Sequence, residues 1–271
     1  MFHYDIFFDM KTALNMTLVV SFLLFSSLGW TFVLPLDFVV KKTVAKTGRS
    51  AITIEQEVTF KSGNDTLKTM ETWAVEGDKN LKVSMTSEDA SKESLHVNSL
   101  FNSKLKTQIT GKNKSSIPLP ADFFEKYLFV RSSDSFYQYL RDLGIAEKTR
   151  LSRADGRICI AIGEASGPDT KNPEIWIDQD DFLIRKIRMP SGTEISFSDY
   201  ARVNDDFWIA KTQVIKWAGA EATIKVKSFS TKNAPTLQSF YPQNFEQHTD
   251  ITFSQSNTLS QVVDDFYKRF R

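Results

Sequence analysis

The feature of this sequence that most constrains its fold is a two-residue hydrophobic period that recurs along the chain. In AITIEQEVTF, residues 51–60, apolar side chains alternate with polar ones, which is typical of a strand with one buried face. Short polar turns, such as KSGND at residues 61–65, separate this segment from the next one of the same kind. Because short turns join antiparallel neighbours, the pattern predicts a meander in which strands pair in sequence order.

Further alternating segments cover residues 66–76, 81–86, 95–101, 104–110, 149–153, 157–164, 174–178, 182–189, 193–200, 207–217 and 221–229. We therefore predict an α+β fold with mainly antiparallel strands, about eleven of them in one up-and-down sheet. No strong repeat and no linker rich in proline or glycine divides these segments. One domain, residues 30–233, is the favoured organisation.

Four segments have the spacing of helices with one apolar stripe instead. They cover residues 34–48, 123–128, 133–144 and 257–270. Ser133 or Asp134 is expected to cap the third helix, and Gly144 is expected to end it. The fourth lies in a C-terminal tail, residues 234–271, and it could close one end of the sheet or bind a partner. Packing onto its own sheet is the favoured alternative.

The N-terminal segment, residues 1–29, has the composition of an export signal. No charged side chain lies between Lys11 and Asp37, and the run MTLVVSFLLF is almost purely apolar. Lys11 would supply the positive end of a signal peptide, and Ser27-Leu28-Gly29 a cleavage site before Trp30. The alternative is an uncleaved anchor in the inner membrane, because the uncharged stretch is about long enough to span it. In both cases the rest of the chain is expected in the periplasm.

Composition argues against several classes of function. The net charge is +1, so no general field attracts nucleic acid. A single cysteine, Cys159, excludes an intrachain disulfide and multi-cysteine metal sites; we interpret it as a buried structural thiol. None of the three histidines stands beside a nucleophile signature, and nucleotide-binding and hydrolase motifs are absent from the sequence. We predict a monomer that is not an enzyme, without catalytic residues, bound metal or cofactor.

The carboxylates of DQDD, residues 178–181, are the best remaining candidates for chemistry. A calcium loop counted from Asp178 would need glycine at its sixth position and glutamate at its twelfth, where Leu183 and Met189 stand. On a strand, Asp178 and Asp180 would share a face and Asp181 would point away. We therefore interpret DQDD as a polar hairpin turn.

Apolar side chains are the more informative feature. The segment FLIRKIRM is apolar on both faces, with Leu183, Ile187 and Met189 on one face and Phe182 and Ile184 on the other. Such strands suit a curved sheet with helices on its inner side. The alternatives are an ordinary core and a cavity for an acyl chain or another extended apolar ligand. The candidate cavity residues are Ile54, Val58, Phe60, Trp73, Val75, Phe136, Leu140, Ile175, Ile177, Ile195 and Phe197.

The order of these elements resembles the periplasmic lipoprotein-sorting proteins of the LolA/LolB type. The likeness is carried by Ile177-Asp178, Arg185-Lys186, Ser198-Asp199-Tyr200 and residues 211–217, and by an early hairpin at residues 70–83. It covers roughly residues 36–230.

The resemblance implies an unclosed half-barrel whose concave face is covered by helices. It also implies non-enzymatic binding and transfer of acylated proteins or lipids. An envelope scaffold or regulatory module on the same fold, with an envelope protein bound through the C-terminal helix, is the alternative function.

Overall fold

The computed structural model describes residues 33–48, 51–76, 80–87, 96–102, 104–110, 113–167, 171–205, 207–232, 240 and 258–271. The predicted leader, residues 1–29, lies outside them. From Leu34 to Arg271 the chain forms one compact unit. Within the described part of the chain, no helix has both the length and the apolar character needed to cross a membrane.

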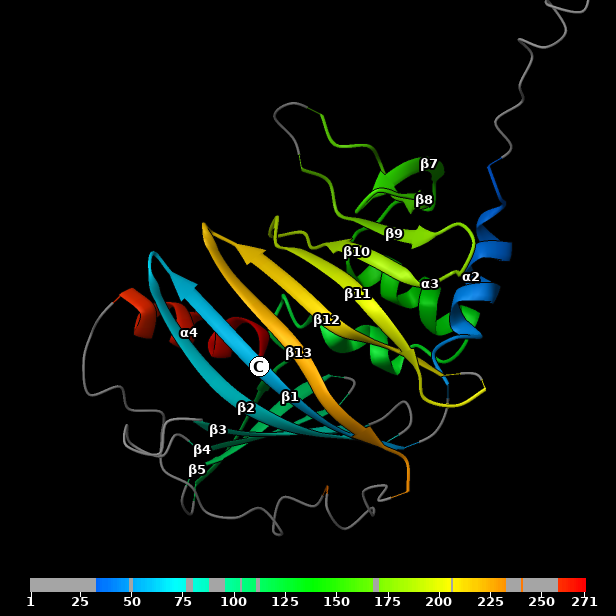
Figure 1. Ribbon diagram of the computed structural model, residues 1–271. Coiled ribbons are helices and arrows are strands. Elements are labelled where there is room, and N and C mark those ends of the chain that lie inside the picture. The colour runs from blue at the N-terminus through cyan, green and yellow to red at the C-terminus, as the bar shows by residue number, and fades with distance from the viewer. Residues whose placement is uncertain are drawn as a thin grey trace, which may run out of the picture. The chain divides into compact units, whose positions relative to one another are not determined.

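The unit is built on one antiparallel sheet of thirteen strands (Figure 1). The strands are β1 (Ile52–Ser62), β2 (Asp65–Glu76), β3 (Asn80–Ser87), β4 (His96–Asn102), β5 (Leu105–Thr110), β6 (Asn113–Pro118), β7 (Thr149–Ala154), β8 (Arg157–Ile162), β9 (Glu174–Asp178), β10 (Ile184–Arg188), β11 (Glu194–Arg202), β12 (Trp208–Trp217) and β13 (Ala220–Ser230). Their order is β6-β5-β4-β3-β2-β1-β13-β12-β11-β10-β9-β8-β7. The sheet is therefore unclosed, with β6 and β7 at its two edges.

Neighbouring strands follow one another in sequence, as predicted, except at one junction. The chain lays down β1 to β6 outward from the middle, passes to the opposite edge, and returns inward from β7 to β13. There β13 pairs with β1, with Val58 opposite Ile224 and Phe60 opposite Ala222. The first and last strands thus hold the two halves of the sheet together.

Among the described residues, four helices accompany the sheet: α2 (Leu36–Val44), the 3-10 helix η1 (Phe124–Phe129), α3 (Ser133–Asp142) and α4 (Thr258–Phe270). In Figure 1, α2 and α3 lie beside the β9–β11 half of the sheet, and α4 lies behind β1 and β2. The cap of α3 is Ser132, one position before the predicted pair, because its hydroxyl accepts from the Ser135 amide. Gly144 follows with φ of 65°, the left-handed conformation that ends many helices.

The structure has two more strands than the predicted number of about eleven. Strand β6 is an element that the pattern missed. It is an edge strand paired only with β5, and Ser115, Ser116 and Ile117 on it are all exposed. Backbone hydrogen bonds hold it in place, so its side chains show no hydrophobic period.

One prediction about strand faces is wrong. Ile184, Ile187 and Met189 all belong to the same core cluster, although Ile184 was expected to face away from the other two. A register shift between Ile184 and Lys186 inserts Arg185 as an extra residue and returns Ile184 to the inner face. Leu183 lies outside that cluster and lines a pocket instead.

The core consists mainly of two clusters on the inward face of the sheet. The larger one joins β1 and β8–β13 to α2, α3, η1 and α4. The smaller one joins β1–β4, β12 and β13 to the chain around η1. Helices and sheet thus meet across two apolar clusters on the inward face, and an apolar ligand that binds between the helices and the sheet would lie in this layer.

Candidate functional site

The candidate cavity residues all lie in this layer, but in two groups. Eight of them belong to the larger cluster: Val58, Phe60, Phe136, Leu140, Ile175, Ile177, Ile195 and Phe197. The other three, Ile54, Trp73 and Val75, belong to the smaller one. All are buried by helix and sheet side chains, so an acyl chain between the two layers requires a helix to move.

Helix α4 covers the part of the inward face formed by β1, β2 and β12, which we call the α4 trough. Phe266 packs edge-on against Phe60 of β1, with ring centroids 5.0 Å apart, and lies 5.8 Å from the Trp217 ring of β12. Phe270 packs against the same tryptophan and against Phe124 of η1. The apolar side chains of α4 therefore fill the trough, and the aromatic residues among them are buried. The prediction that this helix packs on its own sheet is confirmed.

A buried ion network lies at the end of α4. Arg271 is 2% exposed, and its Nε donates to Glu71 Oε1 of β2 at 3.3 Å, while its Nη1 donates to Glu125 of η1. Its guanidinium also stacks 4.7 Å from the ring of Trp73. Burial disfavours every charge here, so the attraction between the arginine and the two carboxylates has to offset a large desolvation cost.

The network extends into the sheet. Glu71 Oε2 accepts from Gln56 Nε2 and from Trp73 Nε1, both at 2.8 Å. Lys106 of β5 donates to the backbone carbonyl of Arg271. Burial raises the pKa of Glu125 to about 7, although Arg271 acts to lower it, and burial lowers the pKa of Lys106 to about 8.

This network was not predicted, but the sequence contains one sign of it. In TLKTMETWAVE the inward positions are Leu67, Thr69, Glu71, Trp73 and Val75. A glutamate on an otherwise apolar face needs a buried cationic partner. Its partner is 200 residues away in sequence, and no local pattern identifies it.

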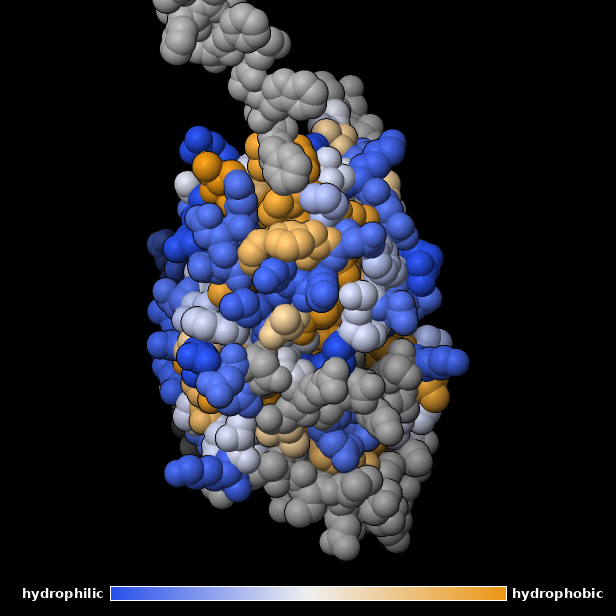
Figure 2. Space-filling model, turned by 90° about the vertical axis from the view of Figure 1, so that its right-hand side faces the viewer, coloured by the Kyte–Doolittle hydropathy of each residue, from blue (hydrophilic) through white to orange (hydrophobic). Residues whose placement is uncertain are grey.

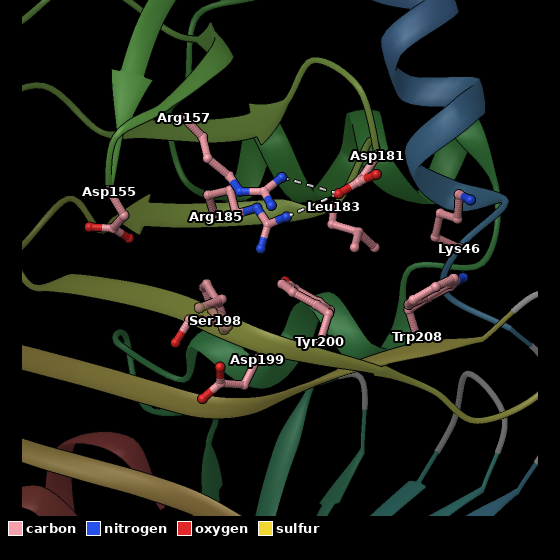
Figure 3. A pocket seen from close by; sticks show the side chains of 11 residues that line it. Lys46, Asp155, Arg157, Asp181, Leu183, Arg185, Ser198, Asp199, Tyr200 and Trp208 are labelled. Carbon is pink, nitrogen blue, oxygen red and sulfur yellow. Dashed lines mark hydrogen bonds and ion pairs between the residues drawn. The ribbon is translucent and has the colours of Figure 1, made fainter.

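A second feature is a pocket of about 450 Å³ between β10 and β11 (Figure 3). These strands pair only from Lys186↔Ser196 to Arg188↔Glu194, and beyond that point they separate. Tyr200 donates from its hydroxyl to the Ile184 carbonyl across the gap. The lining residues are Lys46, Asp155, Arg157, Asp181, Leu183, Arg185, Phe197, Ser198, Asp199, Tyr200 and Trp208.

The charges around this pocket balance, with three cationic and three anionic side chains in its lining. Asp155 and Asp199 have φ of 48° and 52°, and Asp199 accepts from Thr212 Oγ1 at 2.7 Å. In Figure 3, Arg157 and Arg185 both reach Asp181. Because six charged side chains line it, this pocket does not offer the apolar surroundings that an acyl chain needs.

The DQDD segment is a turn between β9 and β10, as predicted. Asp178 Oδ1 accepts from the backbone amides of Asp180 and Asp181, and its Oδ2 accepts from Arg157 at 2.8 Å and Arg185 at 3.0 Å. On a strand Asp181 would point away from Asp178, but residues 179–182 leave the strand and Asp181 pairs with the same two arginines. These carboxylates therefore stabilise the β9–β10 hairpin through hydrogen bonds and ion pairs.

No group of three or more histidine, cysteine, aspartate or glutamate side chains among the described residues is arranged to hold a metal ion. Cys159 is buried, and burial raises the pKa of its thiol, which disfavours the reactive thiolate. The interpretation of Cys159 as structural agrees with this environment.

The outer surface differs from the inward face. Figure 2 shows the side that carries α2, where hydrophobic side chains form a narrow, broken strip between hydrophilic ones. Phe38 of α2 is one exposed aromatic residue, and it packs edge-on against Phe182, with centroids 5.8 Å apart. The broad apolar surface of this molecule is the inward one.

An unclosed antiparallel sheet with helices over its apolar inward face is a half-barrel, and this architecture is similar to that of the following solved structures. An outer membrane lipoprotein-sorting protein domain from Vibrio parahaemolyticus matches with a TM-score of 0.58 and 10% identity, over 77% of this chain and 97% of that one. A LolA superfamily protein from Nitrosomonas europaea matches with a TM-score of 0.50 and 10% identity, over 75% and 98%. The resemblance to the LolA/LolB type is thus confirmed as a likeness of fold. The sequence matches no family model, and no curated protein matches it significantly.

Proposed function

We propose that this protein binds acylated proteins or lipids and transfers them within the periplasm, holding an acyl chain between the sheet and its helices. The observation that carries the proposal is the pair of buried apolar clusters on the inward face of an unclosed sheet. The helices over that layer belong to no strand ladder, so they can move while the sheet stays paired. Two proteins with this fold are described as a lipoprotein-sorting domain and a LolA superfamily member.

The energetics of such binding are simple. Burying each methylene of an acyl chain contributes about 0.8 kcal/mol, so burial of a long chain can offset the loss of apolar contacts when a helix moves away. Binding and release of this kind need no catalytic group, metal or cofactor. The periplasmic location rests on the apolar leader sequence, Met16 to Phe25, together with the fold.

The alternative, a scaffold or regulator that binds an envelope protein through its C-terminal helix, is less well supported. Leu259, Val263 and Phe266 of α4 are buried against the sheet. A partner that binds this apolar stripe would have to remove the helix from the trough first. We therefore place lipid or acylated-protein binding ahead of helix-mediated docking.

The test is titration of delipidated protein with a fluorescent fatty-acyl probe. Ile195→Glu places a charge on the inward face of β11, where it disfavours an acyl chain, and is expected to abolish uptake. Its matched control is Ser196→Glu, the next residue on the same strand, which pairs with Lys186 in the register of β10 and β11 and should leave uptake unchanged.

Because Ile195 is fully buried, far-ultraviolet circular dichroism must accompany the titration. Native mass spectrometry of the wild-type protein, isolated without delipidation, provides a second measurement that needs no substitution. We expect a co-purified acyl lipid or acylated peptide. Well-folded wild-type protein that neither carries such a ligand nor takes up the probe would refute the proposal.

A further inference from the structure

The pocket between β10 and β11 lies where the pairing of the sheet is interrupted. Strand β10 pairs with β11 only from Lys186 to Arg188, whereas β11 pairs with β12 as far as Arg202. On the side of β10, the part of β11 from Phe197 to Arg202 therefore has no partner among the described strands. A strand edge of this kind offers backbone donors and acceptors to another extended chain.

This open edge borders the pocket. Four consecutive residues of β11, Phe197 to Tyr200, line the space of about 450 Å³, and ligand pockets have volumes of about 300–1,000 Å³. Leu183 and Arg185 lie opposite, at the start of β10 (Figure 3). The Tyr200 hydroxyl donates to the Ile184 carbonyl, so a side chain binds the carbonyl at this point of the gap.

The charges that line the pocket are not all neutralised. Its two arginines pair with Asp178 and Asp181. Asp155 and Asp199 also line it and are exposed, and no cationic side chain in the described part of the chain pairs with either of them. Two exposed carboxylates without cationic partners attract a basic group.

The pocket has a different character at its other end. In Figure 3, Lys46 and Trp208 lie away from the two carboxylates, and Lys46 Nζ is 5.5 Å from the centroid of the Trp208 ring. Leu183 and Tyr200 supply apolar and aromatic surface to the lining. An extended peptide with alternating basic and apolar side chains fits these surfaces, because alternate residues of a strand point in opposite directions.

We propose that the pocket between β10 and β11 binds an extended, basic segment of a partner polypeptide. The segment adds to the open edge of β11 and places a lysine or arginine beside Asp155 and Asp199. Backbone hydrogen bonds supply affinity, and the carboxylates make the site specific for basic segments. This inference goes beyond the proposed function and does not depend on it, since Phe197 alone belongs to both sets of lining residues.

The first test is fluorescence anisotropy with the full-length protein and two labelled short peptides. One peptide alternates arginine with valine and the other alternates glutamate with valine, so the two share their strand-forming residue and differ in charge. We expect the Kd of the arginine peptide to be lower by about tenfold, because its charge is complementary to the two carboxylates.

The second test removes these carboxylates. Asp155 and Asp199 have φ of 48° and 52°, a conformation that asparagine also adopts readily, so the double variant Asp155→Asn/Asp199→Asn keeps the shape of the site. We expect it to raise the Kd of the arginine peptide by about fivefold, the effect of two exposed ion pairs. Asp205→Asn is the matched control and should leave the Kd unchanged, because Asp205 is exposed, pairs with Arg202 and lies outside the pocket lining.

Strand addition is tested separately by hydrogen exchange and by a modified peptide. Bound arginine peptide should slow amide exchange in residues 197–202, because new backbone hydrogen bonds protect these amides. An arginine peptide with N-methyl groups on alternate amides keeps its charge and loses half of its backbone donors. Its Kd should be higher by about tenfold.

The outcomes distinguish this site from the acyl-binding layer. Equal Kd values for the arginine and glutamate peptides would overturn the inference, and so would unchanged exchange in residues 197–202. Displacement of the peptide by free arginine at a similar concentration would show that the pocket takes a single amino acid, which also overturns it. Uptake of the fatty-acyl probe should be the same in wild type and Asp155→Asn/Asp199→Asn, so a failure of peptide binding leaves the proposed function standing.

Discussion

Two ion-pair systems in this molecule use the same kinds of side chain in different surroundings. On β9–β11, Glu174, Arg188, Glu194 and Lys186 form a ladder across strands that are already paired through their backbones. Under α4, Arg271 with Glu71 and Glu125 joins a helix to a sheet that has no backbone bond to it. The ladder adds ion pairs between strands that backbone hydrogen bonds already hold together. The buried network instead supplies specific polar contacts between α4 and a sheet with which this helix shares no backbone hydrogen bond.

The largest expected effect comes from breaking the buried network in the sheet. Glu71→Leu leaves Arg271 with one carboxylate and removes the acceptor of Gln56 and Trp73. We expect a loss of about 3–5 kcal/mol in the free energy of unfolding, because one ion pair of the buried arginine is broken and the Gln56 and Trp73 donors lose their buried acceptor. Urea unfolding followed by tryptophan fluorescence measures it.

The comparison partner is Glu194→Leu in the ladder. Glu194 is partly exposed, and Lys186 and Arg188 can turn to water when it is lost. We expect a loss of about 1 kcal/mol or less. Equal losses for the two variants would mean that burial does not distinguish the two systems.

The pH dependence of stability gives the second comparison. The pKa of Glu125 is about 7 in the folded protein, because burial raises it from an ordinary value of 4.5. Over this interval the folded state binds more protons than the unfolded state, so the free energy of unfolding rises as the pH falls from about 7 to 5. The full shift corresponds to up to about 3 kcal/mol.

Glu125→Gln should remove this dependence, and the difference between wild type and variant isolates it from other titrating groups. Glu194 behaves in the opposite way. Burial acts to raise its pKa, but Lys186 and Arg188 hold it below the ordinary value, so its stabilising effect is lost only in more acidic solution. A wild-type protein whose stability falls steadily from pH 7 to 5, in parallel with Glu125→Gln, would contradict the assigned environment.

The different success of sequence reasoning in these regions has a physical cause. Strands such as β1 were predictable because Ile52 and Ile54 alternate with polar neighbours over a half-buried surface. Strand β6 was not, since an edge strand paired through its backbone places few demands on its side chains. The bulge at Arg185 was missed for a related reason: a single inserted residue changes the face of Ile184 without changing local composition.

The candidate site was also predictable only in part. Apolar residues such as Phe60 and Ile195 mark the inward face, because burial is a local property of the strand pattern. The buried ion network depends on contacts between residues far apart in the sequence. Arg271 and Glu71 are 200 residues apart in sequence, and the local pattern around either residue does not identify the other.

The hairpin between β9 and β10 is intermediate between these two systems, because its buried carboxylate, Asp178, pairs with one buried arginine, Arg185, and one exposed arginine, Arg157. Burial acts to raise the pKa of Asp178, but Arg157, Arg185 and the amides of Asp180 and Asp181 hold it below the ordinary value. We expect Asp178→Asn to cost about 1–2 kcal/mol at pH 7.

This contribution disappears as the pH falls through the lowered folded pKa, so the stabilities of wild type and Asp178→Asn should converge in acid. Asp180→Asn is the matched control in the same turn, because Asp180 is exposed and only its backbone amide bonds to Asp178. Thermal unfolding over a pH series measures both. Equal effects of the two substitutions at neutral pH would show that the turn does not depend on the arginine pairs.

The smallest effect is expected at the exposed end of the ladder. Lys186 is 23% exposed, pairs with Glu194 at 2.8 Å, and lies 5.3 Å from the centroid of the Trp176 ring. Lys186→Gln should lower the free energy of unfolding by less than about 1 kcal/mol. Salt at about 1 M should reduce this loss, because screening weakens solvent-exposed ion pairs. Salt should leave the effect of Glu71→Leu nearly unchanged, since ions do not reach the interior. If salt reduces both effects in the same proportion, water has access to the space under α4, and that helix is already displaced for part of the time.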